Sequence, residues 1–444
     1  MMAPTPPIRH HNAMTPVASP LVRRINAGVV MLLQLLLLGA LVGLACWPLN
    51  LVDHWQDLLL HTLPGFTGQS WQAGNLLLAC SPVVVMPVLL ALQAGRWRGG
   101  SGSGIPQTMT SLEDGNQADA LMAPRPVLQR LAIWTIASLS LFPMGREGPV
   151  VQVGAAVAHH LQRRWPQLLS HLSQQDLMAV AAGAGLAGGF NTPLMGVVFV
   201  AEEFTKRFQA RLIWPGLIVC GLAAEISNLG GQPLFALGQV QETLPETSQL
   251  LWGGALGVAC GAAGGLFARL VLEATRWLTP RVRRRPWRCG LVLGIGLATL
   301  ALLSGGHSGG DGEALMSWMI SNPDQHVGGW LSLLTRLLAP CLALGALIPG
   351  GLIDPAFAIG AVLGQMAGHL SDQSIFGLTL GMAAGLAGAT QLPVMSLVFA
   401  VRMAGDQQLL PGVLMAAVIG AYVGRVWMRK PIYHALTDLM HAAR

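Results

Sequence analysis

The chain has 444 residues, of which 52% are hydrophobic, only 10% are charged and 55 are glycine. Soluble domains carry about 25% charged residues, so this composition argues against a soluble enzyme and excludes a disordered chain, which would be polar and highly charged. The net charge of +6 does not indicate a nucleic-acid partner, because the arginines occur in short clusters between apolar runs, as in membrane proteins. The composition predicts a glycine-rich polytopic membrane protein.

Residues 1–27 are rich in proline and basic side chains and predict a flexible cytoplasmic tail, whereas 28–444 predict a single transmembrane domain. Many of its apolar runs are shorter than the ~20 residues of a full membrane span, and glycine and proline interrupt them. Irregular backbone is tolerated in a membrane only where it is buried in protein or lines a cavity, so these segments point to a transport site. The runs cover 29–44, 76–95, 127–144, 150–162, 178–201, 211–229, 250–274, 289–305, 328–348, 356–369, 375–400 and 410–428.

Clusters of basic residues predict how the chain is oriented in the membrane. Five arginines crowd residues 281–288, and Arg425, Arg429 and Lys430 accompany the end of the last apolar run. Cytoplasmic loops carry an excess of lysine and arginine. Both termini and the 281–288 loop are therefore expected on the cytoplasmic side of the inner (plasma) membrane.

The sequence repeats itself. Residues 185–199 return as 385–399 with the same Gly-Leu-Ala-Gly, proline, methionine and Val-Phe positions, and 145–155 returns as 351–361 with the same glycines and proline. Glycine-rich helices can resemble one another by chance, but the matching prolines argue against that explanation. We expect two halves of about 28–210 and 245–430, with the transport site at their interface. The repetition alone does not tell whether the halves are parallel or inverted.

Three glycine-rich breaks each precede an apolar helix, at 102–106, 145–149 and 350–355, and each ends in proline. Proline is favoured in the first turn of a helix, so each break predicts a helix N-terminus with free backbone N–H groups. The helix dipole adds positive potential there, and such ends bind anions without a lysine or an arginine. A phosphate-binding loop is a weaker explanation, because no GxxxxGK[ST] sequence is present.

In combination and in order, these motifs resemble those of the CLC family of chloride channels and chloride/proton antiporters. The resemblance is carried by GSGIP at 102–106, GREGP at 145–149, the Glu202-Glu203 pair and KPIY at 430–433, and it spans about residues 28–436. It implies an all-α fold with two inverted repeats of broken, tilted helices. It also implies a homodimer with one anion pathway per subunit, chloride and protons as the transported ions, and neither a cofactor nor a metal.

The resemblance further implies where the anion binds. Two hydroxyl groups, from Ser103 and Tyr433, are expected on opposite sides of the anion, and backbone amides complete the site. Either hydroxyl could instead form a hydrogen bond with nearby backbone. The implied anion-binding residues are Ser103, Gly148, Leu352, Ile353 and Tyr433.

Two glutamates match the proton-carrying residues of the antiporters. Glu147 matches the gate, whose carboxylate occupies an anion position and leaves when protonation removes its charge, and an acid inside the membrane is a functional candidate by default. Glu203 matches the inner proton-transfer residue, although it could instead cap a helix end beside Lys206 and Arg207. With both glutamates present, proton-coupled exchange is favoured over the alternative, a passive voltage- or pH-gated chloride channel of the same fold.

Some residues depart from the family pattern, and one has two possible roles. Ile353 replaces the usual phenylalanine, and Asp354 adds an acid that would repel an anion if ionised. We expect Asp354 to cap a helix that begins at Pro355, since aspartate is a good N-cap. Arg402 replaces a residue that is often acidic and is expected to alter packing, whereas Arg130 could contribute positive field to the pathway or only flank a helix.

An enzyme is not expected. Residues 306–310, Gly-His-Ser-Gly-Gly, fit the GxSxG pattern formally. That pattern has meaning only in a strand-turn-helix context, and here it follows an apolar run inside a glycine-rich segment. The sequence therefore predicts a loop at this position.

Overall fold

The computed structural model describes residues 20–229, 246–323, 329–371, 373–405 and 407–442, and every named element in these ranges is a helix. Residues 1–19 of the predicted tail lie outside the described residues, and the first helix begins at Pro20, within the range predicted as tail. Six segments are long and apolar enough to cross a membrane: Asn26–Leu60, Ala73–Ala94, Ala210–Ser227, Thr247–Arg284, Pro286–Leu303 and Gln407–Ala442. The chain is a multi-pass, all-α membrane protein.

Proline occupies the first or second position of nine of the described helices, where its missing N–H costs nothing. The first half contains α1 (Pro20–Leu60), α2 (Pro64–Thr67), α3 (Ala73–Cys80), α4 (Pro82–Ala94), η1 (Arg98–Gly100), α5 (Ile105–Glu113), α6 (Gly115–Leu121), α7 (Pro124–Leu139), α8 (Glu147–Arg164), α9 (Gln174–Phe190), α10 (Pro193–Phe199), the π-helical turn η2 (Val200–Phe204) and α11 (Ala210–Ser227). The second half contains α12 (Glu246–Arg284), α13 (Pro286–Leu303), α14 (Glu313–Ser321), α15 (Trp330–Gly345), α16 (Ile353–Gly368), η3 (His369–Ser371), α17 (Ser374–Thr390), α18 (Pro393–Ala404), η4 (Gln407–Leu409), α19 (Leu410–Trp427) and α20 (Ile432–Ala442).

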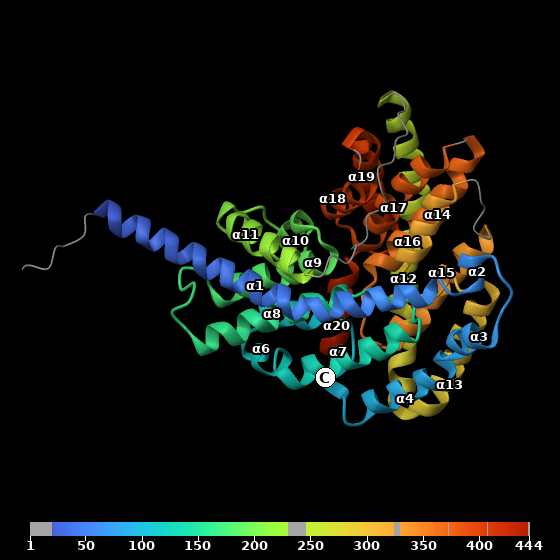
Figure 1. Cartoon of the computed structure of the whole chain (residues 1–444), viewed down its shortest axis with the longest axis horizontal. Coiled ribbons are helices and arrows are strands. Elements are labelled where there is room, and N and C mark those ends of the chain that lie inside the picture. Colours follow the sequence, from blue (N-terminus) through green and yellow to red (C-terminus); the bar gives the residue numbers. More distant parts are fainter. Residues whose placement is uncertain (1–19, 230–245, 324–328, 372, 406, 443–444) are drawn as a thin grey trace, which may run out of the picture.

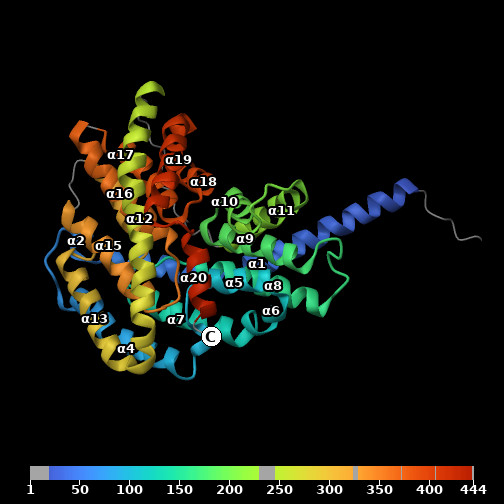
Figure 2. The same cartoon turned by 180° about the vertical axis from the view of Figure 1, so that it is seen from behind.

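The two halves repeat the same packing. Helix α8 lies against α9 at Gly154 and Gly185, and α16 lies against α17 at the equivalent Gly360 and Gly385, with backbone so close that a Cβ on any of the four would collide. Likewise α1 packs on α9 and α11, as α12 packs on α17 and α19. In Figures 1 and 2, α8–α11 and α16–α19 form two groups, and α20 lies between them.

The halves meet through a reciprocal pair of hydrogen bonds. The N–H of Gly145 donates to the carbonyl of Gly351 at 3.1 Å, and the N–H of Gly351 donates to the carbonyl of Gly145 at 2.9 Å. These equivalent residues run antiparallel. Equivalent residues that donate hydrogen bonds to each other are expected where two inverted repeats are related by a two-fold axis. The same pair of hydrogen bonds brings the GREGP break and its counterpart in the second half together.

Each long glycine-rich run of the sequence is two helices. The run at 178–201 breaks where Asn191 adopts a left-handed conformation with φ 46°, and the run at 375–400 breaks where Gln391 does so with φ 63°. Proline two residues later starts α10 and α18. A left-handed residue followed by proline ends the first helix of each run, so α9 stops at Phe190 and α17 at Thr390, and the Glu202-Glu203 pair follows the second helix of its run.

Candidate functional site

The first predicted break positions Ser103 at the start of α5. Gly102 and Gly104 have φ values of 83° and 117°, which a residue with a Cβ adopts only under strain, and Gly104 is the N-cap of the helix. The hydroxyl oxygen of Ser103 is buried and has no hydrogen-bond partner among the described residues. It lies directly against Gly148, where a Cβ would collide with it. The alternative, a hydrogen bond from this hydroxyl to nearby backbone, is therefore not formed among the described residues.

Arg130 holds the loop that leads to Ser103. This arginine of α7 is fully buried, and its guanidinium donates to the carbonyl oxygens of Gly99, Ser101 and Gly102 at 2.8–3.0 Å. It also contacts the amide oxygen of Gln152 on α8. Arg130 thus does more than flank a helix: it fixes the backbone of the first break against the second.

The second and third breaks begin α8 and α16, and Glu147 joins them. The Glu147 side chain is fully buried, and its Oε1 atom accepts a hydrogen bond of 2.7 Å from the backbone N–H of Asp354 in the first turn of α16. The carboxyl group lies between Gly145 and Gly351, neither of which leaves space for a Cβ. The carboxyl group therefore lies at the N-terminus of the helix from the opposite repeat, where free N–H groups and the helix dipole suit an anion.

The predicted capping role of Asp354 is wrong. Helix α16 begins at Ile353, before Pro355, with Leu352 at the N-cap position and no side-chain cap. Asp354 therefore lies inside the first turn, where its backbone N–H is already directed at Glu147. Its side chain is buried, and Oδ2 has no hydrogen-bond partner among the described residues.

Tyr433 lies near the start of α20, the helix between the two repeats (Figure 2). It is fully buried, and its ring meets Phe199 edge-on with centroids 6.5 Å apart. Its hydroxyl has no hydrogen-bond partner among the described residues. Buried polar groups are nearly always hydrogen-bonded, so the hydroxyls of Ser103 and Tyr433, which lack a partner among the described residues, are both available to bind a ligand.

A cavity of about 910 Å³ leads to this region. Ser103 of the first break and Gly350 and Leu352 of the third line it. Of the described residues in its wall, none is acidic and five are arginines, namely Arg98, Arg130, Arg276, Arg283 and Arg284. A cleft lined by one sign of charge concentrates the opposite ion, so this cavity favours anions.

The two neighbouring glutamates at 202 and 203 have separate environments. Glu202 accepts hydrogen bonds from the N–H groups of Val394 and Met395, at 3.0 and 2.7 Å, and thereby caps α18 of the other half. Glu203 is 2% exposed, and its Oε1 atom lies 3.5 Å from Nε2 of His434. The capping alternative considered for Glu203 thus applies to its neighbour instead.

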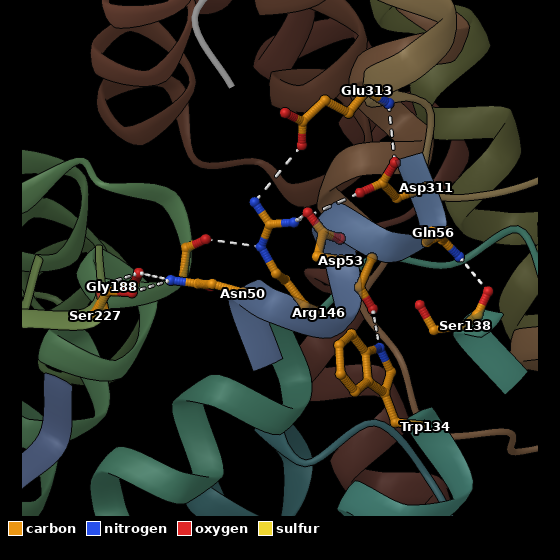
Figure 3. A network of polar contacts seen from close by, with 12 residues as sticks. Asn50, Asp53, Gln56, Trp134, Ser138, Arg146, Gly188, Ser227, Asp311 and Glu313 are labelled. Atoms are coloured by element: carbon orange, nitrogen blue, oxygen red, sulfur yellow. Dashed lines mark hydrogen bonds and ion pairs between the residues drawn. The ribbon is translucent and has the colours of Figure 1, made fainter. Parts of the chain in front are cut away.

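A buried charge network surrounds Arg146, the residue before Glu147 (Figure 3). Its guanidinium contacts Asp53 of α1, Asp311 at 3.9 Å and Glu313 of α14 at 3.6 Å. Its Nε donates to the carbonyl of Gly189 at 2.7 Å. The three acids are spaced as metal ligands could be, but Arg146 supplies the cation among them.

These acids and His434 were not anticipated from the sequence. Asp53 gave a usable signal, because it is an acid within the first apolar helix, and such residues are functional candidates. Asp311 lies in the glycine-rich turn before α14, which is the loop predicted at 306–310 extended by one residue. His434 directly follows Tyr433, so its position was available but its contact with Glu203 was not. Arg402 is exposed on α18 and lies outside the site.

Comparison with known proteins places this geometry in a family. The sequence model of the voltage-gated chloride channel family matches residues 83–425. An H⁺/Cl⁻ exchange transporter, ClcA, from Yersinia pestis bv. Antiqua (strain Angola) is 27% identical over 359 residues, covering 76% of this chain and 72% of the relative. A voltage-gated ClC-type chloride channel, ClcB, from Escherichia coli O81 (strain ED1a) is 28% identical, covering 74% of this chain and 79% of the relative.

Solved structures share the fold. A slow cyanobacterial Cl⁻/H⁺ antiporter superposes with a TM-score of 0.75 at 23% identity, covering 93% of this chain and 98% of that one. A CLC-type fluoride/proton antiporter superposes with a TM-score of 0.69 at 22% identity, covering 92% and 98% of the two chains. At these identities the likeness establishes the arrangement of helices.

Proposed function

The chain belongs to the voltage-gated chloride channel (CLC) family, and we propose that within it the protein works as a secondary-active chloride/proton antiporter. Members of this family are transporters or channels rather than enzymes. Chloride enters from the arginine-lined cavity and binds between the hydroxyls of Ser103 and Tyr433, with the backbone amides of Gly148, Leu352 and Ile353 around it. The exchange activity of the ClcA relative supports this direction.

One observation carries the proposal: the carboxylate of Glu147 occupies the N-terminus of α16. That position suits an anion, so carboxylate and chloride compete for it. Protonation removes the charge of Glu147, and the neutral side chain then has no advantage over chloride. Each exchange of carboxylate for chloride therefore binds a proton, which is the coupling that an antiporter needs.

Glu203 is the proposed inner proton carrier. It is buried on the turn η2, which directly follows α10. Its contact residue, His434, comes immediately after Tyr433, whose hydroxyl we assign to the anion site. A buried carboxyl accepts a proton more readily than it holds an unpaired charge. Protons and chloride thus share the region around Tyr433 but have separate routes, through Glu203 and through the cavity.

The assembly and membrane placement extend the proposal. We place the protein in the inner (plasma) membrane as a homodimer with one anion pathway per subunit and both termini in the cytoplasm. The arginines at the end of α12 line the cavity and belong to the loop that the positive-inside rule assigns to the cytoplasm. The cavity is therefore the cytoplasmic entrance.

Flux through reconstituted liposomes tests the function. An outward chloride gradient should drive protons into wild-type vesicles against their own gradient. Glu203→Gln should abolish proton movement and retain chloride flux. Chloride flux without proton movement in the wild type would contradict the antiporter and leave the passive channel.

A further inference from the structure

Two carboxyl groups share one buried space at the gate. The Oδ2 atom of Asp354 lies 2.5 Å from the position that a Cβ on Gly145 would take, and Oε2 of Glu147 lies still closer to that position. Neither oxygen has a hydrogen-bond partner among the described residues. Glu147 is fully buried and Asp354 is 5% exposed, so bulk water has little access to form hydrogen bonds with these oxygens.

One proton would relieve the conflict between these two groups. Two carboxylates that share a site cannot both ionise easily, and one of them retains a proton. Both oxygens border the same point beside Gly145, so a small side-chain movement would let the protonated oxygen donate to the other. The Oε1 atom of Glu147 already accepts a hydrogen bond from the backbone N–H of Asp354 at 2.7 Å, which keeps the two residues together.

The surrounding charges also require a proton. Among the described residues, the ionisable groups that interact electrostatically with Asp354 are Glu147, Asp311, Glu313, Tyr433, Arg146 and Arg336. Arg146 is engaged by Asp53, Asp311 and Glu313. Arg336 donates to the carbonyls of Gly309 and Gly310. The acids therefore outnumber the guanidiniums, and an uncompensated buried charge is costly.

We propose that Asp354 is a second proton-binding residue of the gate and that it shares one proton with Glu147 while the gate carboxylate occupies α16. The proton is bonded to one carboxyl oxygen and hydrogen-bonded to the other, so the pair carries one negative charge. When chloride replaces the Glu147 carboxylate, the pair binds a second proton, and both side chains become neutral. This inference rests on the proposed function, because it concerns the same gate.

The pair has a specific consequence for pH dependence. Interacting groups titrate in two macroscopic steps. Gain of the second proton, on the acid side, lets chloride enter. Loss of the shared proton, on the alkaline side, leaves two carboxylates at the anion site and closes it to chloride. A gate with Glu147 alone has only the first of these steps.

Chloride flux through liposomes, measured across pH, tests the pair. Wild-type flux should show both steps, and Asp354→Asn should lose the alkaline step and keep the acid one, because the amide donates as the protonated acid does. Asp438→Asn, at an exposed ion pair with Lys430, should behave as the wild type. If Asp354→Asn fails to fold, Asp354→Ser provides a hydroxyl donor for the same comparison.

Two outcomes would overturn the inference. Superimposable profiles of wild type and Asp354→Asn would mean that Asp354 does not titrate with the gate. A uniform rise in flux at every pH would mean that Asp354 is permanently ionised and merely repels the anion. Proton uptake by wild-type vesicles, recorded in the same preparation, reports on antiport separately, so a missing alkaline step in Asp354→Asn would support the pair even if antiport fails.

Discussion

At the scale of single residues, two buried hydroxyls support the proposed anion site. Ser103 and Tyr433 come from different ends of the chain, and each presents a buried hydroxyl without a partner among the described residues. Sequence resemblance could indicate both residues as candidates, but it could not show that their hydroxyls lack hydrogen-bond partners. The absence of a partner depends on the local backbone conformation. At Ser103 the backbone turns through Gly102 and Gly104, which both have positive φ.

Removal of either hydroxyl should weaken chloride binding. A hydrogen bond to a charged group contributes about 1.5–3 kcal/mol, so Ser103→Ala and Tyr433→Phe should each weaken the affinity roughly ten- to a hundredfold. Titration calorimetry on purified protein measures this. The other tyrosine of the chain, Tyr422, is 71% exposed on α19, and Tyr422→Phe should leave the affinity unchanged. An equal loss in all three variants would argue against a local effect.

At the scale of elements, the breaks were predictable and their partners were not. Glycine and proline marked the starts of α5, α8 and α16, because these residues act locally on backbone conformation. The cap of α18 by Glu202 and the contacts of Arg146 with three acids join residues far apart in the sequence. Asp354 shows why sequence alone was insufficient. Aspartate is a residue type that favours the N-cap position, but α16 begins at Ile353 and Asp354 therefore lies inside the helix.

Adjacent glutamates should therefore respond differently to mutation. Glu202→Ala removes the acceptors for the first N–H groups of α18, and loss of a cap costs about 1 kcal/mol. Its thermal unfolding midpoint should fall, and its ratio of transported protons to chloride should stay as in the wild type. Glu203→Gln should show the reverse pattern. A changed ratio in Glu202→Ala with unaltered thermal stability would contradict the assigned roles.

At the scale of the whole molecule, the two-fold relation explains why the site is central. Equivalent glycines exchange hydrogen bonds, so the N-termini of α8 and α16 face each other from opposite repeats. The sequence revealed the repeat from its matching glycines and prolines. It could not reveal that the halves are antiparallel, because that arrangement is seen only in the backbone hydrogen bonds between Gly145 and Gly351.

The predicted orientation is testable in intact cells. In a variant without native cysteines, Arg285→Cys between α12 and α13 should react with a membrane-impermeant maleimide only after the cells are permeabilised. A cysteine introduced at Gln72, just before α3, should react in intact cells, because α13 packs along α4 with Gly290 at Pro87 and Gly294 at Pro82, which directs the start of α3 away from Arg285. Labelling of Arg285→Cys in intact cells would contradict a cytoplasmic cavity entrance.

Competition between the Glu147 carboxylate and chloride is the central claim, and proton uptake on chloride binding tests it most directly. Chloride is added to detergent-solubilised protein in weakly buffered solution while a pH electrode records the bulk. We expect the solution to become more alkaline as the displaced carboxyl binds a proton, and we expect Glu147→Gln to bind chloride without this change. Chloride binding by the wild type with no proton uptake would contradict competition between carboxylate and chloride.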